Sequence, residues 1–128
     1  MRKILCVDDD EDSRILLEAL LGKSGDQIEI RAVATAEDAV ALIAAEHFDL
    51  YILDNWLPDR SGVELCRWIR VADSDTPIVF LSGAAYEKDK LDAIAAGANE
   101  YLVKPSNVND LMQTCRQILD TCIPKKEA

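Results

Sequence analysis

Polar side chains of different chemical kinds follow four apolar runs of the sequence, each at the point where the run ends. Residues 4–7 lead into the acidic cluster Asp8, Asp9 and Asp10; residues 49–53 lead into Asp54; residues 78–81 lead into Ser82; and residues 101–103 lead into Lys104. Carboxylates that lie close together repel one another unless a cation sits among them. If these groups share one site, Asp54 is placed to attack phosphorus as a nucleophile, while the lysine and the hydroxyl hold phosphoryl oxygens.

The elements that must position these groups alternate strictly between strand and helix. Apolar runs predict strands at residues 3–7, 28–33, 49–53, 78–81 and 100–103, and helical spacing predicts helices over residues 12–21, 35–45, 61–71 and 87–96 and a last helix that begins at Ser106 or Asn107. This alternation predicts an α/β fold, a doubly wound (βα)5 sandwich with a five-stranded parallel sheet and helices on both faces. Parallel strands end at one edge of the sheet, so the polar groups that follow them gather there.

Local patterns refine this prediction. Thr35 with Asp38 and Ser61 with Glu64 match the capping box at helix starts, and Gly97 is placed to end the helix before it. In the first helix, Ile15, Leu16, Ala19 and Leu20 recur at helical spacing and predict its apolar stripe. Residues 28–33 alternate apolar and polar, which is typical of an edge strand wetted on one face.

Composition excludes several classes of function. The chain has 128 residues, enough for one domain with a substantial core, and 49% of them are hydrophobic. A net charge of −10 argues against binding to nucleic acid or to anionic membranes, which needs clustered Lys and Arg. No apolar run approaches the roughly 18 residues of a membrane span, and the start lacks a signal-peptide stretch, so a cytoplasmic protein is expected.

The cysteines and carboxylates point to different roles. Cys6, Cys66, Cys115 and Cys122 form no C-x-x-C pair, and one histidine is present, so buried reduced thiols are expected rather than a zinc site. The all-oxygen set at the strand ends favours a hard ion, and Mg²⁺ fits best. Taken singly, the acids after the first strand could simply be favoured at a helix N-terminus, and Asp54 could simply be a residue favoured before a turn. Four complementary groups at four strand ends favour one site.

The sequence resembles a response-regulator receiver domain of two-component signalling, CheY-like in type, across essentially the whole chain. The stretches that carry this resemblance are Val7-Asp-Asp9, Leu53-Asp54 with Leu57-Pro58, Gly62, Phe80-Leu-Ser82-Gly-Ala84 and Tyr101-Leu-Val-Lys104-Pro105. The resemblance implies that Asp54 accepts phosphate from a histidine kinase or a histidine phosphotransfer protein. It also implies that Mg²⁺ is held by Asp8, Asp9, Asp54 and the backbone carbonyl of Trp56, and that Ser82 and Lys104 contact the phosphoryl group. The strand order 2-1-3-4-5 likewise follows from the resemblance.

The resemblance also implies a switch. Ser82 and Tyr101 would move together on phosphorylation and remodel the face of the fourth helix, fifth strand and fifth helix for a downstream protein target. Two positions that tune phosphate loss in this family are Trp56 and Ala84 here, and neither orients water readily. Slow autodephosphorylation is therefore expected, with Trp56 shielding the acyl phosphate. Ser106 stands where Phe is common, which affects local packing only.

Two other classes of protein fit less well. A small phosphatase that forms an aspartyl phosphate needs a second acid two residues after its nucleophile, and this chain has Trp56 there. A flavodoxin-like cofactor binder needs a phosphate-cradling loop after the first strand, where this chain has acids. We therefore expect a signalling phosphoacceptor rather than an enzyme, with a receiver domain over residues 1–122 and a short tail over 123–128. It either stands alone or belongs to a longer regulator.

Overall fold

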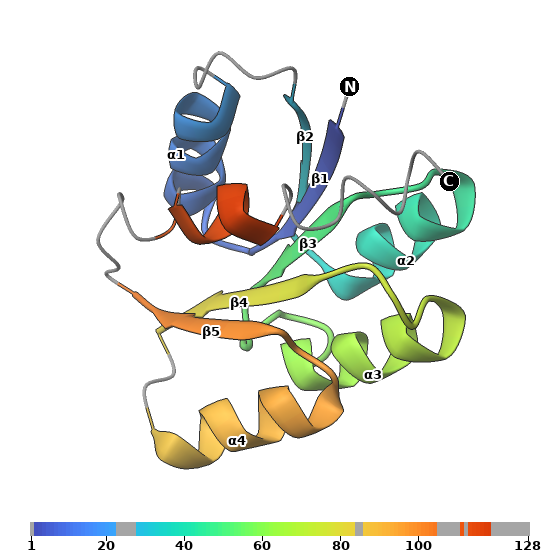
Figure 1. The fold of residues 1–128 in the computed structure, drawn as a ribbon, viewed down its shortest axis with the longest axis vertical. Helices are drawn as coiled ribbons and strands as arrows, with labels where there is room; N and C mark the ends of the chain where they lie inside the picture. The colour runs from blue at the N-terminus through green and yellow to red at the C-terminus, as the bar shows by residue number, and fades with distance from the viewer. Residues whose placement is uncertain (1, 23–27, 84–85, 105–110, 112, 119–128) are drawn as a thin grey trace.

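A five-stranded parallel sheet forms the centre of the molecule (Figure 1). The computed structural model describes residues 2–22, 28–83, 86–104, 111 and 113–118. In chain order its elements are β1 (Arg2–Val7), α1 (Glu11–Gly22), β2 (Ile28–Val33), α2 (Ala36–Ala45), β3 (Leu50–Leu53), α3 (Gly62–Ala72), β4 (Ile78–Ser82), α4 (Glu87–Ala96) and β5 (Glu100–Val103). The strand order is β2-β1-β3-β4-β5, and every pairing is parallel. The predicted fold class and strand order are therefore confirmed.

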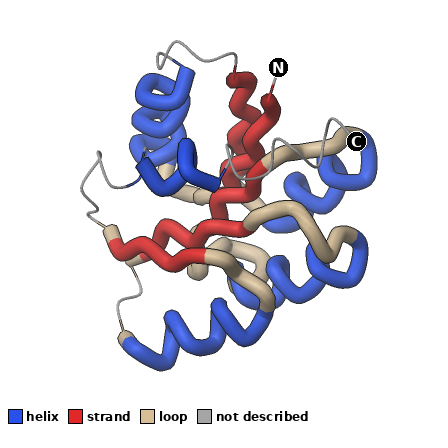
Figure 2. The backbone as a smooth tube through the Cα atoms, viewed as in Figure 1, coloured by secondary structure: helices blue, strands red, loops and turns tan. Residues whose placement is uncertain are grey.

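Helices cover both faces of the sheet (Figure 2). One core cluster joins the sheet to α2, α3 and α4 through residues such as Ala39, Leu65 and Ala93. The other joins its opposite face to α1 and the C-terminal helical residues through Leu17, Leu111 and Cys115. Because β1, β3 and β4 are covered on both sides, their buried residues are apolar apart from Ser82, as expected of central parallel strands.

The predicted helix signals act as the sequence indicates. The Thr35 side chain accepts a hydrogen bond from the Asp38 amide at the start of α2, and the Ser61 side chain accepts one from the Glu64 amide at the start of α3. Gly97 ends α4 in the left-handed region, with a φ of 117°. The strand β2 lies at the edge of the sheet and is only partly buried, as its alternating pattern predicts.

The predicted apolar stripe of α1 is wrong in part. Ile15, Leu16 and Ala19 are exposed, whereas Leu17 is buried in the core; the side chain of Leu20 lies outside the described part of the chain. Helical spacing alone left the phase of the stripe ambiguous, because apolar residues occupy three consecutive positions. The starts proposed for the last helix, Ser106 and Asn107, lie outside the described residues, as do Cys122 and the tail. Cys6, Cys66 and Cys115 are buried free thiols, as expected.

Among the residues that the structure describes, no helix is both long and apolar enough to span a bilayer.

Candidate functional site at the carboxyl edge of the sheet

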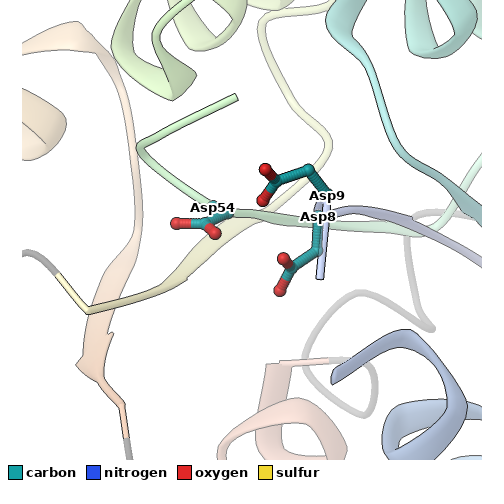
Figure 3. A group of neighbouring side chains, drawn as sticks. All are labelled: Asp8, Asp9 and Asp54. Atoms are coloured by element: carbon teal, nitrogen blue, oxygen red, sulfur yellow. The ribbon is translucent and has the colours of Figure 1, made fainter. Parts of the chain in front are cut away.

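Three carboxylates meet where β1 and β3 end. One oxygen from each of Asp8, Asp9 and Asp54 lies within 4.8 Å of the others. Figure 3 shows the three carboxylates turned to the same side of the strand ends. Asp8 and Asp54 are buried, whereas Asp9 is exposed. Their convergence follows from the topology: β1 and β3 are hydrogen-bonded neighbours, with Val7 opposite Leu53, so the residues that follow them emerge together.

Lys104 joins two of these carboxylates from the end of β5. Its Nζ lies 2.7 Å from Oδ2 of Asp8 and 3.4 Å from Oδ2 of Asp54. Burial alone would lower the pKa of Lys104, but the hydrogen bond to Asp8 and the charges of Asp8 and Asp54 outweigh burial and raise it. Burial raises the pKa of Asp8, and the contact with Lys104 opposes that rise. The site therefore holds a protonated lysine among acids that are partly withdrawn from water.

The acids after β1 divide between two tasks. Asp10 caps α1: its carboxylate accepts hydrogen bonds from the Asp12 amide at 3.2 Å and from the Ser13 hydroxyl at 2.9 Å. Asp8 is fixed by its surroundings, since its Oδ1 accepts from the Asp10 amide at 2.9 Å and its carbonyl accepts from Nη1 of Arg14 at 2.6 Å. Asp8 and Asp9 are thus the members of the acidic run that face Asp54.

The loop between β3 and α3 folds back on itself beside Asp54. The Gly62 amide donates to the Asn55 carbonyl at 2.7 Å, and Trp56 and Ser61 form an antiparallel bridge. The Trp56 amide donates to Oδ1 of Asp54 at 3.3 Å, so the Trp56 backbone lies next to the Asp54 carboxylate. The Trp56 side chain is 65% exposed.

Gly62 permits this tight return of the loop. A Cβ at position 62 would lie 2.2 Å from the Asp54 carbonyl oxygen and 2.9 Å from the Asn55 Cα. Both are backbone atoms that cannot yield cheaply, so we expect Gly62→Ala to lower the free energy of unfolding by about 1–3 kcal/mol. Gly83→Ala is the matched control, because a Cβ there has no atom within 4 Å. Urea unfolding measures both, and equal stability of the two variants would contradict the prediction.

Ser82 and Tyr101 lie behind the carboxylates. The Ser82 hydroxyl is fully buried at the end of β4 and accepts a hydrogen bond from the Asn55 amide at 3.4 Å. The Tyr101 ring faces Phe80, with 5.6 Å between ring centroids and 13° between ring planes. Burial raises the pKa of Tyr101, while hydrogen bonds with the side chains of Ser82 and Asn55 oppose the rise. Tyr101 thus lies in an inward position, linked to Ser82.

The predicted site residues Asp8, Asp9, Asp54, Trp56, Ser82 and Lys104 all lie at this edge of the sheet, and Ala84 is outside the described residues. Sequence reasoning missed Asn55 and Arg14. Asn55 is buried directly after Asp54, and the sequence does not distinguish it from an ordinary residue of the turn that follows. Nothing in the spacing of Arg14 indicates its contact with the Asp8 carbonyl.

The fold and the site define a class of protein: a CheY-like α/β domain with acids, a hydroxyl and a lysine at the ends of its strands. The solved response regulator receiver domain protein (CheY-like) from Methanospirillum hungatei superposes with a TM-score of 0.87 at 32% identity, covering 100% of this chain and 99% of that one. A two-component response regulator from Clostridium difficile gives a TM-score of 0.88 at 32% identity, with 94% and 97% covered.

The family model described as the response regulator receiver domain matches residues 4–116. This chain belongs to that family, the receiver domains of two-component signal transduction. Transcriptional regulatory protein GltR of Pseudomonas aeruginosa is 38% identical over 120 residues, covering 92% of this chain and 49% of GltR. Transcriptional regulatory protein YvrH of Bacillus subtilis is 36% identical over 124 residues, covering 97% of this chain and 52% of YvrH. The chain thus spans about half the length of these curated relatives.

Proposed function

We propose that Asp54 accepts a phosphoryl group from a phosphohistidine on a histidine kinase or a histidine phosphotransfer protein. A carboxylate oxygen of Asp54 attacks phosphorus; the new O–P bond forms as the N–P bond breaks, and the electron pair of that bond stays on the imidazole nitrogen of the donor. The observation that carries the proposal is the placement of Lys104, 2.7 Å from Asp8 and 3.4 Å from Asp54. The protonated amine of Lys104 can bind a phosphoryl oxygen and so hold the phosphoryl group next to the Asp54 carboxylate.

Mg²⁺ fits the donor set. Carboxylate oxygens from Asp8, Asp9 and Asp54 lie within 4.8 Å of one another, and hard oxygen ligands are the ones that Mg²⁺ prefers. The backbone carbonyl of Trp56 would add a further oxygen, as the family resemblance implies, and the Trp56 amide keeps this stretch of backbone beside the Asp54 carboxylate. When bound, the ion neutralises negative charge on the acids and on the phosphoryl oxygens.

The switch follows from the contacts of Ser82. When the Ser82 hydroxyl turns to a phosphoryl oxygen, it loses its hydrogen bonds with Asn55 and Tyr101. The Tyr101 ring then moves in the space beside Ser82. Tyr101 lies on β5 and belongs to the same core cluster as Ala93 and Ala96 of α4, so its movement alters the surface that a downstream protein target reads. The phosphoryl group adds about two negative charges to a packed site, and this new charge shifts the domain between its two conformations.

The domain acts as a phosphoacceptor that promotes its own phosphorylation and slow dephosphorylation, rather than as an enzyme with its own turnover. A small aspartyl-phosphate phosphatase is less well supported, because that chemistry needs an acid where Trp56 stands. The exposed side chain of Trp56, two residues after Asp54, would restrict the approach of water to an acyl phosphate there. It therefore favours a long-lived acyl phosphate.

Intact mass after incubation with a small phosphodonor and Mg²⁺ tests the proposal. We expect the full chain to gain one phosphate, and Asp54→Asn and chelation of the metal to abolish the gain. Following the loss of that mass after removal of the donor gives the lifetime, and Trp56→Asn should shorten it. A gain that persists in Asp54→Asn would refute Asp54 as the acceptor.

A further inference from the structure

The loop that carries Trp56 is tied down at two places. At its base, the Gly62 amide donates to the Asn55 carbonyl at 2.7 Å. At its tip, Asp59 reaches the N-terminus of α2: Oδ1 accepts from the Ala36 amide at 3.0 Å and Oδ2 accepts from the Glu37 amide at 2.9 Å. Trp56 lies between these two ties.

Asp59 is not a routine cap, because α2 already has one of its own. The Thr35 hydroxyl accepts from the Asp38 amide at 3.1 Å, which leaves the two preceding amides to Asp59, more than twenty residues further along the chain. Those two hydrogen bonds hold the pKa of Asp59 below its ordinary value, so the carboxylate is charged when it binds the helix. The first turn of α2 is thus joined to a separate loop by both oxygens of one side chain.

The start of α2 is itself fixed relative to the acids. The Asp8 amide donates to the Val33 carbonyl at 3.0 Å, and Ala36 follows Val33 by three residues. Asp59 therefore connects the loop after Asp54 to the segment that is hydrogen-bonded to Asp8. Without Asp59, the loop keeps its base but loses the contact that sets its tip relative to Asp8.

We infer that Asp59 is a positioning residue for the site: by binding the N-terminus of α2, it holds the Trp56 backbone where its carbonyl can join the carboxylates around a divalent cation. This inference rests on the proposed function, because it concerns the same cation. Residues that orient the ligands of a metal typically change its affinity by about 10–100-fold when they are replaced. A residue that merely stabilises α2 would not change the affinity.

Mg²⁺ titration of three variants separates these two roles. Trp56 and Trp68 are the only tryptophans, so a Trp68→Phe background makes Trp56 the reporter of the site. In that background we expect Asp59→Ala to weaken Mg²⁺ affinity about tenfold. Asp59→Asn, with one accepting oxygen, should fall between Asp59→Ala and the parent. Thr35→Ala is the matched control: it removes a cap of the same helix but leaves the loop tied, and its affinity should stay within about twofold of the parent.

Hydrogen exchange of the metal-free chain provides the second readout. Asp59→Ala should speed exchange of the amides between Trp56 and Ser61, whereas Thr35→Ala should speed exchange within α2 only. The inference is overturned if Asp59→Ala binds Mg²⁺ as tightly as the parent, or if Thr35→Ala weakens binding equally. A parent that shows no Mg²⁺ binding by fluorescence and calorimetry would refute the proposed cation site itself, and the inference with it.

Discussion

Lys104→Met is expected to lose about 10²–10³-fold in the rate of phosphoryl transfer to Asp54, the cost typical of removing one preorganised group that stabilises charge in a transition state. The ammonium of Lys104 lies 3.4 Å from the acceptor carboxylate and cannot be replaced by a mobile water without loss of position. Methionine keeps much of the side-chain length and removes the charge. The rate of phosphate gain from a small phosphodonor, at saturating Mg²⁺, measures the effect.

The same variant should keep its metal, and this distinguishes a lost transfer group from a collapsed site. Lys104 lies 2.7 Å from Asp8, a carboxylate that we assign to the cation, so its positive charge competes with Mg²⁺. We therefore expect Lys104→Met to bind Mg²⁺ at least as tightly as the parent. Lys3→Met is the control, because Lys3 pairs with Glu46 at the opposite edge of the sheet. A transfer rate within threefold of the parent would contradict the assignment of Lys104.

The architecture was predictable because each local pattern agreed with the others. Apolar runs such as residues 78–81, caps such as Thr35 and Ser61, and the turn at Gly97 all indicate the same alternation of strand and helix. Once the strands are parallel, the position of Lys104 near Asp8 follows from topology, although 96 residues separate them. The kinds of chemical group in the site could therefore be predicted from the residues that follow the strands.

Contacts that depend on rotamers and loop shape were not predictable. The run Ile15–Leu16–Leu17 gives no phase to its helix, and only packing against the sheet decides that Leu17 is buried. Asp59 looks like an ordinary turn residue after Pro58, because its partners are amides of a helix that precedes it in the chain. Asn55 is similar: its burial depends on how tightly the loop returns at Gly62.

The opposite edge of the sheet carries a side-chain network centred on Arg70. Arg70, near the end of α3, donates from Nε to the Gly97 carbonyl at 3.0 Å and from Nη1 to the Thr76 carbonyl at 2.7 Å. Its Nη2 donates to Oδ1 of Asn99 at 3.1 Å, and that oxygen also accepts from the Ile78 amide at 2.9 Å. One guanidinium thus joins the loops that enter β4 and β5.

Arg70→Ala is therefore expected to lower the free energy of unfolding by about 2–3 kcal/mol, because it removes charged hydrogen bonds and leaves partly buried carbonyls to find water. Arg70→Lys should recover little, since a single ammonium cannot reproduce the planar fork that reaches four separate acceptors, the Asp73 carbonyl at 3.2 Å among them. Arg67→Ala on the exposed side of the same helix is the control and should change stability by no more than about 0.5 kcal/mol. Urea unfolding with a shared m-value measures all three. Because Arg70 lies at the opposite edge of the sheet from Asp54, its replacement should lower stability without changing Mg²⁺ affinity. If Arg70→Ala and Arg67→Ala lowered the free energy of unfolding equally, the network would contribute nothing to stability.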